Sequence, residues 1–286
     1  MSNNSSVFFD CFQSGPLRIL FMCFNVFNLL TLPLFLNVLY IAYRQNRRRR
    51  SAAAFPSSSG PAVSHSDMFT FHMAAMDVIG ELAPLLRLYG LLANKYKIIV
   101  YAFYIFYFMW SGEVMFHSLT CLDRYLAAVH PITYMGLRQG WALKLRSVVI
   151  ASVWLISSIS TYLAYVQYSS IVAIVFLTLI LIVIAFCSLS VLCVLIRKGP
   201  GSQSAYRMDP NKRRAFKSIL IILTVLLLRY TWSLTTAVYG AIVPFNHVYC
   251  WFGVLELMIW VPGALVLPVL FLYKRWALAC SKHSTR

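Results

Sequence analysis

The chain has 286 residues, of which 60% are hydrophobic and 12% are charged, whereas soluble domains are roughly 45–50% apolar and about 25% charged. This composition excludes an ordinary soluble domain, a coiled coil, a collagen and a disordered protein. The net charge of +17 is compatible with nucleic-acid binding, but 15% aromatic residues and long uncharged runs favour a membrane protein with basic loops and no nucleic-acid partner.

Seven apolar runs are long enough to cross a bilayer, whose hydrocarbon core takes about 20 helical residues. In chain order these runs are residues 17–43, 68–92, 98–129, 148–166, 170–196, 215–243 and 249–273. The second run is the weakest because it contains His72, Asp77, Glu81 and Arg87, and without it the count would be six. Its other residues are apolar, which favours a helix whose polar side chains face other helices. We therefore predict an all-α membrane protein with a seven-helix bundle over residues 17–273.

The basic residues predict the orientation of this bundle. With the N-terminal tail (1–16) outside, the inner segments are 44–67, 124–146, 197–217 and a cytoplasmic tail or short amphipathic helix at 274–286, and they hold 20 of the 25 Lys and Arg residues. This asymmetry follows the positive-inside rule, and basic inner segments suit the anionic lipids of the inner leaflet. The sequons at Asn3 and Asn4 would then be outside and available for glycosylation.

A motif at the end of the third run points to a family. Asp123, Arg124 and Tyr125 lie at its predicted inner end, and Pro131 follows seven residues after the arginine. With seven spans and an outer N-terminus, this segment resembles the rhodopsin-like (class A) G-protein-coupled receptors, and the resemblance covers essentially the whole chain. Further matches are Asn37, residues 73–77, Trp154 and residues 228–234.

The chain also departs from the pattern of that family. Leu267 and Phe271 occupy the polar positions of the seventh-span motif Asn-Pro-x-x-Tyr, and Leu234 replaces the sixth-span proline. Ile99 stands where the family has the outer cysteine of the third span. We therefore expect a divergent, orphan-like receptor.

The resemblance implies a plasma-membrane protein that converts an extracellular ligand into activation of a heterotrimeric G protein. It implies that Asp123, Arg124 and Tyr125 form the G-protein switch, in which release of the arginine admits the G protein. Alternatively, Arg124 only extends to the interface and anchors its helix. The basic residues 212–214 either contact the G protein or serve the topology alone.

Three ionisable residues are expected near the middle of the membrane. They are Asp77 in the second span, Glu113 in the third and Arg229 in the sixth. In the family, the position of Asp77 helps to hold a sodium ion. A mid-membrane arginine without a partner costs at least a few kcal/mol, so we predict that Arg229 faces these carboxylates in an internal polar network. The alternative is that Glu113 is simply protonated.

The outer half of the bundle is the expected place for a ligand pocket, since sites between helices are common. By family position, the lining residues are Arg87, Tyr101, Phe103, Phe106, Tyr107, Trp110, Trp232 and Glu256. Arg87 together with Lys95 and Lys97 would favour an acidic or lipid ligand, whereas pairing of Arg87 with Glu256 would leave an apolar pocket. The aromatic residues could also serve packing alone.

The sequence lacks the patterns typical of an enzyme, a cofactor site or a metal centre. A Ser-His-Asp order, a glycine-rich phosphate loop and an HExxH motif do not stand out. Glu113 and His117 are four residues apart, but two residues do not make a zinc site. Two rival hypotheses remain: a transporter or proton pathway built on Asp77, Glu81, Glu113 and His117, and a receptor fold that no longer signals.

Two cysteines are expected on the oxidising outer side, Cys11 in the tail and Cys250 at the start of the seventh span. Some chemokine, angiotensin and nucleotide receptors join the tail to the seventh span in this way. The resemblance therefore implies a Cys11–Cys250 disulfide, and the alternative is that both are free thiols.

Overall fold

The computed structural model describes residues 15–53, 65–136, 140–166, 170–196, 210–243 and 247–284, and these contain helices and no strand. The helices are α2 (Gly15–Ala53), α3 (His65–Gly80), α4 (Leu82–Leu92), α5 (Tyr96–Val129), α6 (Pro131–Gly136), α7 (Gly140–Val166), α8 (Ser170–Ile196), α9 (Pro210–Ile242) and α10 (His247–Ser284). The prediction of an all-α fold is confirmed.

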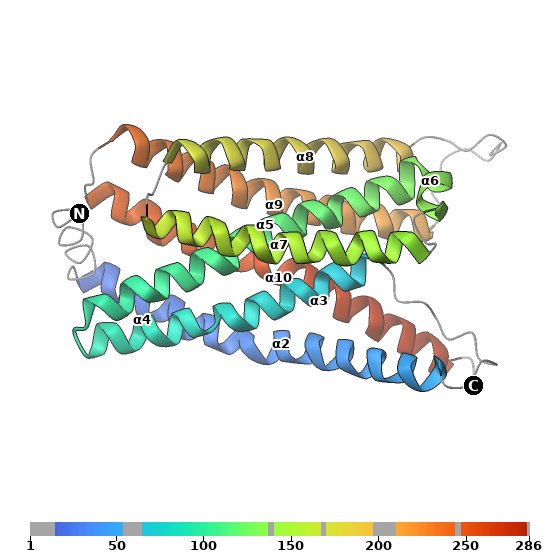
Figure 1. The fold of residues 1–286 in the computed structure, drawn as a ribbon, viewed down its shortest axis with the longest axis horizontal. Helices are drawn as coiled ribbons and strands as arrows, with labels where there is room; N and C mark the ends of the chain where they lie inside the picture. Colours follow the sequence, from blue (N-terminus) through green and yellow to red (C-terminus); the bar gives the residue numbers. More distant parts are fainter. Residues whose placement is uncertain are drawn as a thin grey trace.

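Within the described residues, seven helical segments are long and apolar enough to cross a membrane, and α3 and α4 together form the second of them. This count includes residues 68–92, in agreement with the predicted seven spans. The helices run back and forth along one long axis (Figure 1). As a result, α2 begins at one end of the bundle and α10 finishes at the other, and we refer to these as the Gly15 end and the Ser284 end.

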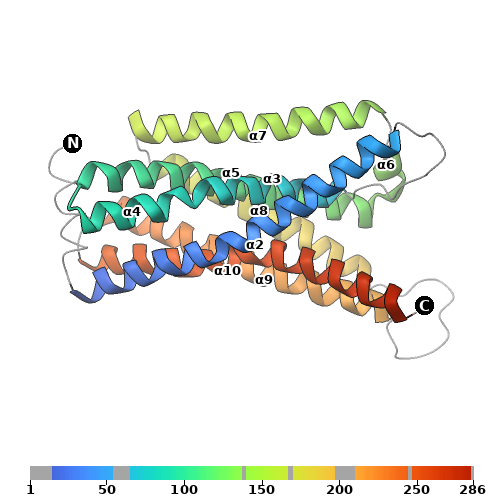
Figure 2. The same cartoon turned by 90° about the horizontal axis from the view of Figure 1, so that it is seen from below.

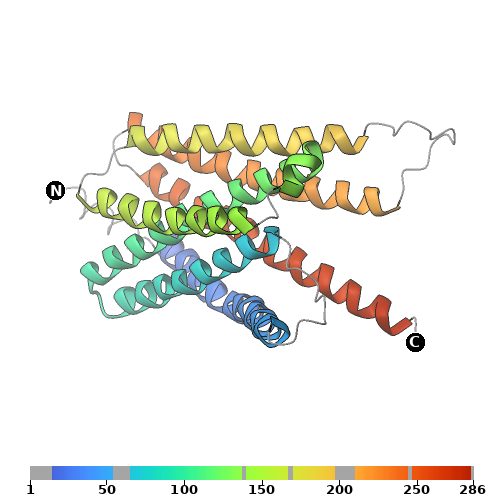
Figure 3. The ribbon, with the colours of Figure 1, turned by 45° about the vertical axis from the view of Figure 1, so that its right-hand side comes forward.

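The helix α5 occupies the centre of the bundle, where it packs against α3, α4, α7 and α8. The helices α9 and α10 pack against each other, and α10 also contacts α2. Figure 3 shows α9 and α8 on one side of the bundle and α2, α3 and α4 on the other. Individual side chains of α5 also reach α9 and α10.

The second span is interrupted at Glu81, between α3 and α4. Pro84 lies three residues further on, and proline has no N–H to donate to the carbonyl four residues earlier, here that of Gly80. The amide of Glu81 still donates to the carbonyl of Asp77 at 2.9 Å. The helix is therefore locally opened rather than ended, and the opening lies at a buried acidic residue.

Two glycines allow α3 and α5 to approach closely. A Cβ atom on Gly80 would lie 2.2 Å from the sulfur of Met109, and one on Gly112 would lie 2.0 Å from the sulfur of Met76. Each helix therefore inserts a methionine against a glycine of the other helix. This packing fixes the rotation of α5 and places Glu113, the residue after Gly112, inside the bundle.

The outer surfaces of α7 and α8 are apolar and exposed. On α8 the exposed large side chains include Ile171, Val172, Val175, Leu179, Ile182, Phe186 and Leu189. Figure 2 shows α7 along one edge of the bundle, where it packs mainly on α5. Monomeric soluble proteins rarely expose extended apolar surfaces of this kind. Such surfaces are suited to contact with lipid tails.

Candidate functional site

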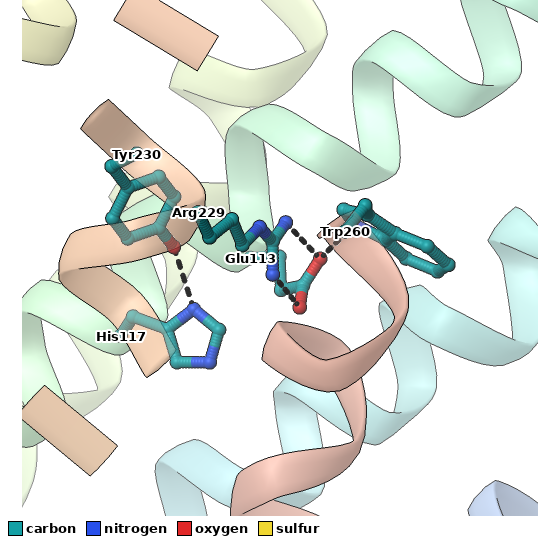
Figure 4. A network of polar contacts seen from close by, with 5 residues as sticks. All are labelled: Glu113, His117, Arg229, Tyr230 and Trp260. Carbon is teal, nitrogen blue, oxygen red and sulfur yellow. Dashed lines mark hydrogen bonds and ion pairs between the residues drawn. The ribbon is translucent and has the colours of Figure 1, made fainter. Parts of the chain in front are cut away.

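A buried ion pair joins the central helix to α9 (Figure 4). Nη1 of Arg229 donates to Oε1 of Glu113 at 2.7 Å, and Nη2 donates to Oε2 at 2.9 Å. Arg229 is 2% exposed and Glu113 is fully buried. The two parallel hydrogen bonds form the bidentate arrangement that the planar guanidinium group makes best, so the pair fixes orientation as well as charge.

Residues of α10 complete the surroundings of this pair. Nε1 of Trp260 donates to Oε2 of Glu113 at 3.0 Å, and its ring lies 5.6 Å from the guanidinium carbon of Arg229. Gly263 packs against the arginine, since a Cβ atom there would lie 2.4 Å from Cδ of Arg229. The carboxylate thus holds α5, α9 and α10 together at a single point.

A second polar contact between α5 and α9 lies beside the ion pair. Nδ1 of His117 lies 2.7 Å from the hydroxyl of Tyr230, and both side chains are fully buried. The ring of Tyr230 also faces the guanidinium of Arg229 at 5.2 Å, as Figure 4 shows. About one turn of α5, from Glu113 to His117, therefore carries two separate hydrogen-bonded links to α9.

Asp77, the third member of the predicted midplane network, is buried in α3. Neither of its carboxylate oxygens has a hydrogen-bond partner in the described part of the chain. The structure therefore joins Glu113 and Arg229 directly and leaves Asp77 outside their hydrogen bonds. Trp260 takes the third place, because its indole N–H reaches the carboxylate from α10.

Arg87 of α4 is buried in a cluster of aromatic rings. Its guanidinium carbon lies 5.4–6.0 Å from the ring centroids of Phe21, Phe24, Phe103 and Phe106. Its Nε donates to Oδ1 of Asn25 in α2 at 2.7 Å. Aromatic faces attract a cation and compensate part of the cost of burying it, so Arg87 joins α2, α4 and α5.

The other predicted pocket residues are distributed over separate contacts. Tyr107 and Trp110 pack against each other, and the ring of Trp232 stacks on that of Phe252. Tyr101 is 59% exposed. The predicted pocket residues therefore form one group around Arg87, two separate aromatic pairs and an exposed tyrosine.

Glu256 of α10, the acidic residue among the predicted pocket residues, hydrogen-bonds with the side chains of Ser233 and Thr236 in α9. These contacts join α10 to α9, whereas Arg87 hydrogen-bonds with Asn25 of α2. Arg87 and Glu256 thus each bond other residues, and the alternative in which Glu256 neutralises Arg87 is not the arrangement observed.

The predicted switch residues Asp123, Arg124 and Tyr125 are half-buried near the Ser284 end of α5. The hydroxyl of Tyr125 lies 3.2 Å from Nε2 of His130, and its ring packs against Phe186 of α8. Asp123 and Arg124 both have interaction partners. The motif therefore lies where α5 meets α8, beside the short helix α6.

Only one residue of the predicted disulfide and glycosylation sites lies within the described part of the chain. Cys11, Asn3 and Asn4 lie outside the described residues. Cys250 is buried near the start of α10 and is not among the free thiols of the described chain, which are Cys23, Cys121, Cys187 and Cys193. The pairing of Cys11 with Cys250 stays a prediction.

Within the described ranges, no group of three or more His, Cys, Asp and Glu side chains is placed to hold a metal ion. No family model and no curated protein matches this chain. What the described residues define by themselves is a multi-pass membrane protein with seven membrane-spanning helices and a buried ion pair at its centre.

Sequence reasoning missed two residues that hold the buried charges, Trp260 and Asn25. Trp260 lies in an apolar run and Asn25 is one of three asparagines in the first span. Polar atoms inside a predicted span are a signal that could have identified both, because polar groups in membranes usually face a partner inside the bundle.

Proposed function

We propose that this protein is a divergent G-protein-coupled receptor of the plasma membrane, which converts binding of an extracellular ligand into activation of a heterotrimeric G protein. The Gly15 end would face the outside and the Ser284 end the cytoplasm. The proposal is supported chiefly by one combination: the Asp123-Arg124-Tyr125 motif lies at the predicted inner end of the central helix of a seven-helix bundle.

The distribution of charge supports this orientation. Helical residues such as Arg44 and Arg47 extend α2 at the Ser284 end, where α7 also begins close to Lys144. Basic residues near the ends of spans are retained on the cytoplasmic side. A G protein approaching this side would meet the end of α5 and the basic ends of the neighbouring helices.

The links between α5, α9 and α10 support a mechanism. A ligand at the outer half would act on Phe106 or Trp232, and these side chains belong to helices that meet at Glu113. Trp260 contacts Phe106 and also donates to the carboxylate of Glu113. A displacement of Trp260 would thereby weaken the hold of α5 on α10 and permit α9 to move, which would open the inner end around Arg124.

Basal signalling tests this proposal without a known ligand. Cells would express graded surface amounts of the chain, and dissociation of each class of heterotrimeric G protein would be followed by energy transfer between labelled subunits. We expect basal dissociation that rises with surface amount. Arg124→Ala should abolish it at near-normal surface expression, because the arginine that receives the G protein is gone.

The matched control is Arg44→Ala, which removes an exposed basic residue at the same end of the bundle and should retain the signal. Equal signalling by Arg124→Ala would refute the switch. A chain that reaches the surface and activates no G protein would favour a receptor fold that has lost signalling. A proton current carried by the chain would instead favour the proton-pathway hypothesis.

A further inference from the structure

Three buried polar atoms near Arg87 lack hydrogen-bond partners among the described residues. They are Oδ1 of Asn28 in α2, Oε2 of Glu81 at the junction of α3 and α4, and Nη1 of Arg87 in α4. Their side chains are 3%, 4% and 1% exposed, respectively. A buried polar atom without a partner destabilises the fold, and more so if the atom is charged. Three such atoms therefore call for a common explanation.

The same three residues line one small cavity. Its wall also contains Phe106 and Trp260, and its volume is about 10 Å³. This volume is roughly the minimum that one water molecule requires, and a buried water normally makes about three hydrogen bonds. The cavity thus has the size of a single water and is lined by three residues that each carry an unpartnered polar atom.

The chemistry of the three atoms distinguishes between small ligands. The carboxylate oxygen and the amide oxygen accept hydrogen bonds, whereas the guanidinium nitrogen donates one. A water molecule can donate to both oxygens and accept from the nitrogen at the same time. A sodium ion would lie against the cation of Arg87, and a chloride ion would lie against the carboxylate of Glu81, so like charges would oppose either ion.

We propose that this cavity is a binding site for one ordered water molecule, which donates to Asn28 and Glu81 and accepts from Arg87. Two other polar atoms of the group already have partners within the protein. Oε1 of Glu81 accepts from Thr31 at 3.2 Å, and Nε of Arg87 donates to Asn25 at 2.7 Å. The water completes a polar cluster that joins α2 to α4 and to the junction at Glu81.

The position of the site gives the water a structural role. Glu81 is the residue at which α3 and α4 separate, so the water links this opening to α2 and to Arg87 of α4. Trp260, whose ring borders the cavity, donates to Glu113 of the central ion pair. The hydrated cluster and the ion pair are therefore neighbours separated by one indole ring. This inference does not depend on the proposed signalling function.

A high-resolution experimental map of the full chain tests the site directly. We expect one density peak about 2.7–3.2 Å from each of the three atoms, the range of ordinary hydrogen bonds. A map in which Glu81 and Arg87 bond each other directly, with no peak between them, would overturn the proposal. A peak with the short, oxygen-only contacts of a metal ion would also overturn it.

Radiolytic labelling provides a second test that does not require a map. Ionising radiation converts an ordered water to a radical that oxidises its immediate neighbours, and Met109 lines the cavity while being 1% exposed. Met73 is fully buried and does not line it, so it is a matched control. We expect Met109 to be oxidised several-fold faster than Met73, and equal rates would contradict the site.

The variant Asn28→Leu provides an additional comparison, because it replaces one of the acceptors and fills the space with an apolar side chain. In this variant the oxidation rate of Met109 should fall to that of Met73. A folded variant that retains the fast labelling would refute the assignment. If the variant fails to fold, the comparison of the two methionines in the unaltered chain still decides the question.

Discussion

Replacing Arg229 by methionine removes the cation of the central pair while keeping a long apolar side chain. Glu113, which is fully buried, would lose both guanidinium hydrogen bonds and keep only the donor of Trp260. Removing one partner of a buried ion pair costs about 3–5 kcal/mol, because the other charge is left uncompensated. We expect a loss of unfolding free energy in this range. The double variant Arg229→Met/Glu113→Leu should recover most of it, because neither charge of the pair is then left without its partner.

Unfolding in mixed micelles with increasing denaturing detergent, followed by tryptophan fluorescence, measures these differences. The matched control is Leu228→Met, which alters the preceding residue of α9, where the side chain is 61% exposed. The control should change stability by far less than Arg229→Met. If Arg229→Met were no more destabilising than the control, or if the double variant were as unstable as the single one, the pair would not contribute as described.

Three further predictions concern neighbouring features. Gly263→Ala should destabilise the protein by about 1–3 kcal/mol, because the new Cβ overpacks the side chain of Arg229, whereas Gly253→Ala, which has open space around it, should be neutral or mildly stabilising in the same unfolding assay. Basal signalling should be nearly equal in sodium and in choline at fixed ionic strength, since Arg229 already neutralises the buried carboxylate, and a strong sodium dependence would contradict this. Mass spectrometry of unreduced peptides should find Cys11 joined to Cys250, and labelling of both as free thiols would exclude the bridge.

The seven spans could be predicted because a membrane helix must satisfy its own backbone hydrogen bonds and cover about 30 Å of hydrocarbon. These requirements appear in the sequence as long apolar runs. The opening at Glu81 depends on Pro84 and on burial of the acidic residue by α2 and α5, and a hydropathy pattern contains no information about such neighbours. Helix ends beyond the membrane, as at Ala53 of α2, are likewise not constrained by apolar length.

The sequence predicted that the partner of Arg229 is a carboxylate, but not which carboxylate it is. Charge alone required a carboxylate, and both Asp77 and Glu113 satisfied that requirement at similar depth. The choice was made by packing, because the contacts of Gly112 and Gly80 with methionines set the rotation of α5 against α3. Contacts between helices that are distant in sequence decided which carboxylate faced α9.

The bidentate ion pair between Arg229 and Glu113 also provides a pivot point for α9. Pro210 lies 19 residues before Arg229 and Ile242 lies 13 residues after it, so the two arms of this lever are about 28 Å and about 20 Å long at 1.5 Å per residue. A tilt of about 10° around the fixed point would carry the two tips in opposite directions, by about 5 Å and about 3.5 Å, from the arm lengths given by the helical rise. A small displacement of the Ile242 end of α9 would thus produce a larger displacement of the Pro210 end in the opposite direction. The ion pair at the centre would remain intact.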